Sequence, residues 1–398
     1  MMVVIGLFIL LLLSFFIWLD FHLGRKNVQR HEIKTPSSCS GNALLLTTGT
    51  QFFDTLFEDI EKARHHLHIQ FYIYHEDCIG KEMSSLLKKK AKEGVQVRLL
   101  VDYMGSFFLK KKAIKELKKA GVQFAYSFSP EFPYFFYKLN RRNHRKVTII
   151  DGHTGFMGGF NVGDEYLGRD PKLGYWRDYH MQLSGPVIHT FQQQFLMDWE
   201  AACGEKISGS ENEYFPEQQE GPIKITTLFS ARDIYSFCLQ QINQAKTSIT
   251  IGSPYFIPDR TLQNALLHAI KRGVEVTLLV PMKSDHLLVK EASYFYFKDL
   301  LKAGCRVEEY YEGFFHAKVF LVDDKICDIG TANFDQRSFF TNSEVNCIFE
   351  DEHLIQEAQK AIKEDLDRSE TLTLTVWERM SYWKKTKILV AKVFSPFL

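Results

Sequence analysis

The sequence predicts an α/β protein made of two similar halves that follow a single N-terminal transmembrane helix. The spacing His-x-Lys-x-x-x-x-Asp occurs twice, as His144–Asp151 and His316–Asp323, and an asparagine follows each histidine by 17 residues. Segments that read as helix, glycine and buried strand recur around both motifs. Residues 3–19 form an apolar run that only Ser14 interrupts.

Length and composition limit the protein class. At roughly 100–200 residues per domain, 398 residues indicate about two domains. A formal net charge of +1 argues against a general electrostatic grip on nucleic acid. The seven cysteines are scattered and include no CxxC pair, which argues against a disulfide framework or a zinc cage. His65, His66 and His68 have no acidic or cysteine partner at ligand spacing, so we expect no metal site.

The apolar run is expected to be a transmembrane anchor over residues 1–19. Its length is at the short end of what spans a bilayer. It has no basic segment before it and no small-residue cleavage site after it, which disfavours the alternative of a cleaved signal peptide. Positive charge gathers on the cytoplasmic side of membranes. We therefore expect a basic juxtamembrane linker over residues 20–40 and a cytoplasmic body, because four basic residues follow the run: Arg25, Lys26, Arg30 and Lys34.

The repeated segments define the two halves. AKEGVQVRLLVD (91–102) matches IKRGVEVTLLVP (270–281), and LKKAGVQFAY (117–126) matches LLKAGCRVEEY (300–310). Alternating helices and strands on this scale indicate an α/β architecture with largely parallel pairing. We place the first half at 41–203 and the second at 223–367, joined by an acidic, turn-rich linker at 204–222.

The halves differ just before the motif. Between the repeated glycine and the motif histidine the first half has about 11 more residues than the second, around SFSPEFPYFFYKL (127–139). This insert carries six aromatic residues and two prolines. It is either a loop packed on the core or an acyl-chain or membrane-facing lip beside the site. We favour the lip, because exposed apolar patches usually mark interaction sites.

Residues 368–398 form an amphipathic tail. Trp and Phe mixed with Lys and Arg suit an interfacial helix, although the tail could equally close the second half. We favour the interpretation that the tail lies on the membrane surface. Two further expected helices, near 88–92 and 110–119, are rich in lysine. These lysines either form solvated helix faces or attract anionic lipid.

The duplicated motif suits chemistry on a phosphate group. In a strand the histidine and lysine of each motif lie on one face. Lysines neutralise phosphoryl oxygens and asparagine amides donate to them. One neutral histidine can attack phosphorus while the other, protonated, gives its proton to the leaving alcohol. The candidate residues are His144, Lys146, Asp151, His316, Lys318 and Asp323 as the catalytic motifs, with Asn161 and Asn333 binding the phosphate.

Each histidine needs a partner that fixes its tautomer. Aligning SEVNCIF with RDYHMQL places Glu344 opposite Asp178, and we expect Glu344 to orient His316 and Asp178 to orient His144. The motif aspartates lie at strand ends, where we expect them to order the local turn rather than transfer protons. Arg141, Arg142 and Arg145 flank the first histidine and could hold an anionic headgroup.

These residues resemble the phospholipase D superfamily, whose mark is two HxKxxxxD motifs with downstream Gly and Asn. HRKVTIID, GGFNVGDEY and WRDYH, then HAKVFLVD and GTANFDQRS, look like the segments of bacterial cardiolipin synthases. The resemblance covers roughly residues 41–370. It implies two phospholipase D-like α/β/α halves that share one active site, no metal or other cofactor, His144 as nucleophile and His316 as acid and base. With one N-terminal span instead of two, the chain looks more like a minor or secondary synthase.

The resemblance implies an activity as well. A cardiolipin synthase transfers a phosphatidyl group between two phosphatidylglycerol molecules and releases glycerol, through a phosphohistidine. The implied partners are phosphatidylglycerol, other anionic phospholipids and the cell membrane, with no nucleic acid. The alternatives are a hydrolase or headgroup-exchange enzyme on phospholipids, a nuclease, and a non-catalytic lipid-binding protein. The motifs leave the acceptor and the oligomeric state open.

Overall fold

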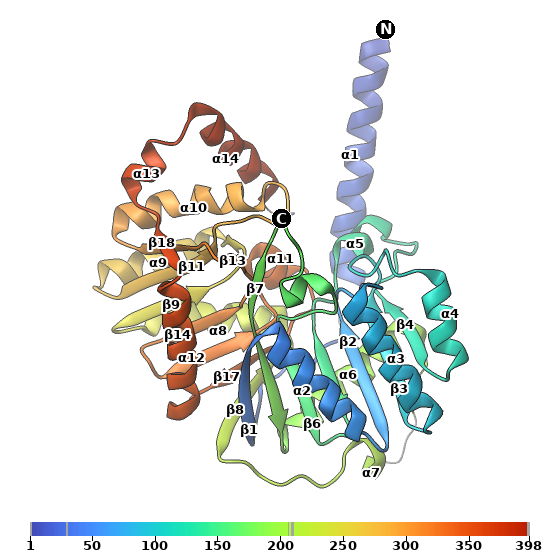
Figure 1. The fold of residues 1–398 in the computed structure, drawn as a ribbon. Helices are drawn as coiled ribbons and strands as arrows, with labels where there is room; N and C mark the ends of the chain where they lie inside the picture. Colours follow the sequence, from blue (N-terminus) through green and yellow to red (C-terminus); the bar gives the residue numbers. More distant parts are fainter. Residues whose placement is uncertain (1, 29–30, 206, 208–210, 396–398) are drawn as a thin grey trace.

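The computed structural model describes residues 2–28, 31–205, 207 and 211–395 (Figure 1). Helix α1 (Met2–Asn27) continues past the expected end of the anchor at residue 19, and Ile5–Asn27 is long and apolar enough to cross a membrane. Much of the expected 20–40 linker is therefore helix, or belongs to the first strand, which begins at Ser37. Arg30, residues 206 and 208–210 of the expected linker, and residues 396–398 of the tail lie outside the described residues.

The first half runs from the first strand to a long buried helix. Its elements are β1 (Ser37–Thr48), α2 (Gly49–Lys62), β2 (His66–Phe71), α3 (Cys78–Lys92), β3 (Gln96–Asp102), α4 (Lys111–Lys119), β4 (Gln123–Ser127), α5 (Phe135–Asn140), β5 (Val147–Ile150), β6 (Thr154–Gly158), a 3-10 turn (Asp164–Leu167), β7 (Tyr175–Ser184) and α6 (Val187–Cys203).

The rest of the chain repeats this order and adds a tail. Its elements are α7 (Glu211–Tyr214), β8 (Ile223–Leu228), α8 (Ala231–Gln244), β9 (Ser248–Gly252), β10 (Phe256–Ile257), α9 (Arg260–Lys271), β11 (Glu275–Pro281), α10 (Val289–Ala303), β12 (Arg306–Tyr310), β13 (Gly313–Phe315), β14 (Val319–Val322), β15 (Ile326–Gly330), β16 (Phe334–Asp335), α11 (Gln336–Phe340), β17 (Asn346–Phe349), α12 (Glu352–Leu366), β18 (Ser369–Thr371), α13 (Leu374–Glu378) and α14 (Tyr382–Phe394).

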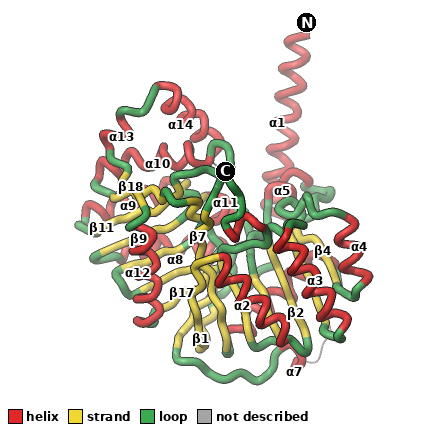
Figure 2. Tube along the Cα trace, viewed as in Figure 1, coloured by secondary structure: helices red, strands yellow, loops and turns green. Residues whose placement is uncertain are grey.

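The two halves form one continuous sheet that is symmetric about its centre. From β1 outward the order is β7, β6, β5, β2, β3, β4, and from β8 outward it is β17, β15, β14, β9, β11, β12, with β1 and β8 paired between them. Each of these strands thus has a counterpart in the other half, whereas β10, β13, β16 and β18 have none. Figure 2 shows the strands running across the molecule with helices on their outer faces.

The expectation of largely parallel pairing is wrong. The outer strands of each half, β2–β3–β4 and β9–β11–β12, pair in parallel through helical crossovers, and the short pairs β7–β13 and β10–β16 are also parallel, whereas the motif strands pair antiparallel with their neighbours. The reason is the short turn after each motif strand. Asp151 and Asp323 adopt positive φ values of 53° and 52° there, and so tight a turn can join only antiparallel strands.

The repeated glycines end helices as expected. Gly94, Gly121, Gly273 and Gly304 have φ values of 94°, 99°, 91° and 103°, which glycine adopts without steric cost after the last helical turn. A largely buried strand begins two residues after each of these glycines. The same local rule therefore fixes four helix-to-strand connections, two in each half.

The core is divided into three clusters. One lies under α2, α3 and α4 of the first half, and one under α8, α9 and α10 of the second. The third takes residues from both halves, including Phe191 of α6, Ile355 of α12 and Phe315 beside the second motif. This shared cluster fixes the halves against each other where the motifs meet.

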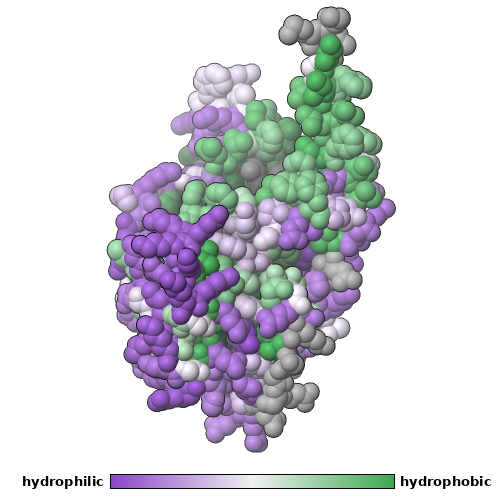
Figure 3. Space-filling view, turned by 90° about the vertical axis from the view of Figure 1, so that its right-hand side faces the viewer, coloured by the Kyte–Doolittle hydropathy of each residue, from purple (hydrophilic) through white to green (hydrophobic). Residues whose placement is uncertain are grey.

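The insert and the tail lie at the end of the body from which α1 projects (Figure 1). The tail packs on the second half: Trp377 Nε1 donates to Tyr294 O over 3.0 Å, and Ile388 and Ala391 are buried. Its outer face exposes Tyr382 and Trp383. Figure 3 shows apolar side chains gathered on α1 and on the surface near it, and hydrophilic ones over the lower body.

Candidate active site

Each motif histidine is positioned by the other half of the protein. His144 N donates to Ser343 O over 2.9 Å, and His316 N donates to Arg177 O over 2.7 Å. His144 and Lys146 precede β5, and His316 and Lys318 precede β14, so these pairs lie in the segments that lead into the motif strands rather than in the strands. Each motif therefore starts beside the carboxylate-bearing segment of the opposite half.

The histidine–carboxylate pairs are crossed relative to the expectation. His144 Nδ1 lies 2.9 Å from Glu344 Oε2, and His316 Nδ1 lies 2.5 Å from Asp178 Oδ2. The expected pairs, Asp178 with His144 and Glu344 with His316, are wrong. Aligning the halves pairs residues within one half. The backbone hydrogen bonds of His144 with Ser343 and of His316 with Arg177 instead place each carboxylate beside the motif of the other half.

Both carboxylates are buried and held by further donors. Thr331 Oγ1 donates to Glu344 Oε2 over 2.7 Å, and Tyr179 N donates to Asp178 Oδ1 over 2.8 Å. Burial raises the pKa of each carboxyl, but the neighbouring groups prevail: Lys318 and His316 lower the pKa of Asp178, and His144 lowers that of Glu344. Both therefore stay ionised at neutral pH and can accept the Nδ1 proton of their histidines.

The two motif lysines are buried beside the motif histidines. Lys146 Nζ donates to His144 O over 2.8 Å, and Lys318 Nζ lies 2.6 Å from His316 Nδ1 and 3.9 Å from Asp178 Oδ2. Burial lowers the pKa of Lys318 to about 8. Burial, then the charge of Lys318, lowers the pKa of Lys146 well below its usual value. Two buried amino groups whose charged forms are disfavoured are an arrangement that a bound anion would stabilise.

Burial also controls the two histidines. It lowers the pKa of His144 to about 4, although Glu344 raises it, and it lowers the pKa of His316 to about 4, to which Lys318 adds. Both imidazoles are therefore neutral near pH 7 when the site holds no anion. A neutral imidazole can attack phosphorus, and the other can act as an acid only after an anion has raised its pKa.

The site opens into a cavity of about 400 Å³ between the halves. His144, His316, Asn161 and Asn333 all line it. Asn161 Oδ1 accepts from Ile73 N over 3.1 Å and Asn161 Nδ2 donates to Tyr166 Oη over 3.1 Å, so Asn161 also holds the cavity wall. Among the described residues, the buried Asn333 Oδ1 has no hydrogen-bond partner.

The motif aspartates lie at the other end of the motif strands, and neither lines the cavity. Asp151 accepts from the backbone N of Arg64, His65 and His66, and Asp323 accepts from that of Lys246, Thr247 and Ser248. A catalytic role for them stays a prediction. They tie the turn after each motif strand to the start of β2 and β9, which agrees with the turn-ordering role.

Two of the arginines beside His144 are paired with carboxylates of the protein. Arg145 is buried and its guanidinium donates to both oxygens of Asp198, to Glu344 O and to Phe229 O. Arg142 lines the cavity, but its guanidinium is paired with Asp102 at 2.9 Å. Arg145 thus connects the first motif to the second half, a role that the sequence did not reveal because its partners lie far along the chain.

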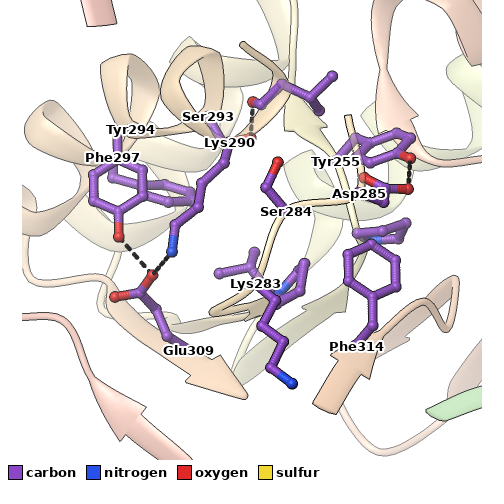
Figure 4. A pocket seen from close by; sticks show the side chains of 14 residues that line it. Tyr255, Lys283, Ser284, Asp285, Lys290, Ser293, Tyr294, Phe297, Glu309 and Phe314 are labelled. Atoms are coloured by element: carbon purple, nitrogen blue, oxygen red, sulfur yellow. Dashed lines mark hydrogen bonds and ion pairs between the residues drawn. The ribbon is translucent and has the colours of Figure 1, made fainter. Parts of the chain in front are cut away.

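A second pocket, near α10, lacks the motif residues (Figure 4). Its volume is only about 10 Å³. Its polar groups pair with each other: Tyr294 Oη donates to Glu309 over 2.6 Å, Lys290 Nζ lies 3.3 Å from Glu309, and Tyr255 donates to Asp285. This pocket has no room for a substrate, and we assign the chemistry to the larger cavity between the halves.

Comparison with known proteins identifies the family of this chain. The protein-family model described as "Cardiolipin synthase, PLD-like domain" matches residues 56–199 and 238–366. The minor cardiolipin synthase of Bacillus subtilis (strain 168) is 38% identical over 100% of this chain and 98% of its own length. The major cardiolipin synthase of the same strain is 42% identical over 89% of this chain and 75% of its own. The crystal structure of a phosphatidylserine synthase from Haemophilus influenzae Rd KW20 shares the fold, with a TM-score of 0.70 at 15% identity over 92% of this chain and 98% of that one.

Proposed function

The chain belongs to the cardiolipin synthase family of PLD-like enzymes, and we propose that it joins two phosphatidylglycerol molecules and releases glycerol. The observation that carries this proposal is the pair of buried histidines, each bonded to a carboxylate of the other half, at the floor of one cavity. Two such histidines suit a double displacement at phosphorus, because one can attack while the other handles the proton of the alcohol.

In the first step His144 Nε2 attacks the phosphorus of phosphatidylglycerol. The bond between phosphorus and the glycerol oxygen breaks, and protonated His316 gives its Nε2 proton to that oxygen, so glycerol leaves. The phosphatidyl group is then held on His144, whose imidazolium is stabilised by Glu344 through Nδ1. Lys146 and Lys318 stabilise the charge that gathers on the non-bridging oxygens.

In the second step the roles of the histidines reverse. Neutral His316 takes the proton of a hydroxyl on a second phosphatidylglycerol, and that oxygen attacks phosphorus. The bond to His144 breaks, His144 returns to the neutral form, and cardiolipin is released. The proton on His316 is then ready for the next turnover, so protons and phosphodiester bonds balance over the cycle.

We place the cavity at the cytoplasmic surface of the membrane. Cardiolipin synthases are membrane enzymes, and α1 is a candidate span. Phe108 and Phe132, which are 83% and 85% exposed, lie in loops of the first half, while α14 exposes Trp383 at 76%. These exposed apolar side chains support the proposal that the body of the protein rests on the bilayer. Lipid would then reach the site without crossing water. Arg25 and Lys26 at the end of α1 support the cytoplasmic side.

The test is a product analysis with the purified full-length protein. Vesicles that contain phosphatidylglycerol labelled in its acyl chains are incubated with the protein, and the lipids are separated. We expect labelled cardiolipin and one free glycerol for each cardiolipin. Phosphatidic acid as the sole product would favour the hydrolase alternative. His144→Asn should abolish product formation and leave membrane association intact, because α1 is untouched.

A further inference from the structure

A groove lies between α1 and the first half, outside the catalytic cavity. Its volume is about 480 Å³. Six of its lining residues come from one face of α1, because their spacing repeats every three or four positions. They are Ser14, Ile17, Trp18, Phe21, His22 and Arg25. The opposite wall comes from α5 and from the segment after α11, through Tyr137, Asn140 and Thr341.

The wall of this groove is fixed by specific contacts between α1 and α5. Tyr137 N donates to Asp20 Oδ2 over 2.8 Å, and the rings of Phe21 and Tyr137 meet edge to face at 6.2 Å. Gly24 packs so closely on Tyr137 that an added Cβ would lie 2.6 Å from its side chain. The transmembrane helix is therefore docked on the insert that leads directly into His144, and the groove beside it has a defined shape.

The groove changes from apolar to cationic along α1. Ile17 and Trp18 line the part farther from the body, and Trp18 is 58% exposed. His22 and Arg25 line the part nearer the body, and among the described residues Arg25 has no carboxylate partner. Ser14 and Arg25 are eleven positions apart, or about 16 Å along a helix. That is about half of the roughly 30 Å hydrocarbon core, which matches one leaflet.

The groove and the catalytic cavity share a thin wall. Arg337 Nη2 donates to the carbonyl oxygen of Asn140, a groove residue, over 3.1 Å, and Arg337 also lines the catalytic cavity. Thr341 lines the groove, and the next residue, Asn342, lines the cavity. A lipid held in the groove would thus have its headgroup beside the chamber that contains His144.

We propose that this groove binds one anionic glycerophospholipid of the adjacent leaflet, with an acyl chain along Ile17 and Trp18 and its phosphate near Arg25, and passes it to the catalytic cavity. This inference rests on the proposed function, because it names the path by which that substrate leaves the bilayer. The order of apolar and cationic residues matches the order of chain and phosphate in such a lipid, and a soluble substrate would not need the groove.

The first test fills the groove. Ser14→Trp and Thr341→Trp place a large ring in it, whereas Leu12→Trp on the opposite face of α1 is the matched control. The full-length variants are assayed on long-chain phosphatidylglycerol in phosphatidylcholine vesicles and on a short-chain, water-soluble phosphatidylglycerol. We expect the two groove variants to lose at least tenfold in kcat/KM on vesicles, with little change on the soluble substrate and none for Leu12→Trp.

The outcomes separate the two proposals. If the groove variants lose no activity, or lose it equally on both substrates, the proposed lipid path is wrong. The Ser14→Trp variant gives this answer even if Thr341→Trp disturbs folding, because Ser14 is exposed on α1. If the unmodified protein makes cardiolipin from the soluble substrate, the proposed function stands whatever the groove variants do. If it makes none from either substrate, the proposed function itself fails.

The second test separates the groove from general attraction to an anionic surface. Arg25 and Lys26 are adjacent exposed cations at the end of α1, but only Arg25 lines the groove. Arg25→Gln should raise the KM for vesicle phosphatidylglycerol several-fold, and Lys26→Gln should change it by less than twofold. Equal effects of the two substitutions would mean that the charge acts on the surface as a whole, and would overturn the assignment of the phosphate to Arg25.

Discussion

His144 Nδ1 lies 2.9 Å from Glu344 Oε2, although the two residues are 200 positions apart and belong to different halves. The reciprocal pair, His316 and Asp178, is separated by 138 positions. Neither half can orient its own histidine. The duplication has therefore produced two halves that depend on each other for catalytic geometry, which explains why their sheets are joined through β1 and β8 and share a core cluster.

The crossed pairs predict which step each carboxylate supports. Glu344→Gln should slow formation of the covalent intermediate, because the imidazolium of His144 loses its stabilising charge. Asp178→Asn should slow protonation of the leaving group by His316. Each substitution should lower kcat by about 10²–10⁴-fold on phosphatidylglycerol, the usual range for acid–base groups. The assay is steady-state turnover of the purified variants.

A substrate with a better leaving group distinguishes the two variants. Phosphatidyl-nitrophenol needs no proton on its departing oxygen, so Asp178→Asn should recover most of the rate of nitrophenol release in the first turnover, whereas Glu344→Gln should remain slow. Pairing within each half would give the reverse result, with recovery by Glu344→Gln.

Arg145 is predicted to hold the fold together rather than bind substrate. Its removal would leave the Asp198 carboxylate buried without a cation, since both Asp198 oxygens accept from Arg145 at 2.8–2.9 Å. Arg145→Met should lower the free energy of unfolding by about 3–5 kcal/mol, the usual cost of breaking a buried pair. Arg169→Met, which removes an exposed pair with Asp164, should cost about 0–1 kcal/mol. Denaturant titration of the solubilised proteins measures both, and equal losses would contradict the prediction.

The fold and the residues that line the cavity can be predicted from the sequence more fully than the hydrogen-bond partners of those residues. Local rules suffice for the repeated glycines, because a helix end needs only nearby residues. The motif spacing likewise identifies His144 and His316. The crossed pairing with Asp178 and Glu344 could not be read from either half alone, because it depends on how two sheets meet. For the same reason the partners of Arg145 could not be predicted from its place beside His144.

Buried histidines also predict a loss of stability in acid. Burial lowers the pKa of His180 from 6.5 to about 3, so between these values the unfolded chain binds a proton that the folded chain does not. The free energy of unfolding should therefore fall as the pH drops from about 6.5 towards 3, by up to about 1.4 kcal/mol per pH unit for this residue. His180→Leu should reduce that slope. Denaturant titrations at several pH values would contradict this if His180→Leu left the slope intact.

Anion binding is predicted to draw a proton into the site. His144 and His316 have pKa values of about 4 in the free site, and the buried Lys146 has a pKa well below its usual value. A bound anion favours the charged form of every one of these groups and so raises their pKa values. At pH 7 the site should therefore take up on the order of one proton per anion bound, which supplies the acid that the first step requires.

Calorimetric titration with sulfate at pH 7, in two buffers of different ionisation enthalpy, measures this uptake, because sulfate itself does not titrate there. His316→Asn should lower the number of protons taken up if the proton settles on His316. If the His316→Asn variant takes up as many protons as the unmodified protein, the proton settles on Lys146 instead. If the unmodified protein takes up none, His316 is already protonated in the free site. In that last case His316 would be charged before the substrate arrives, and no anion would be needed to raise its pKa.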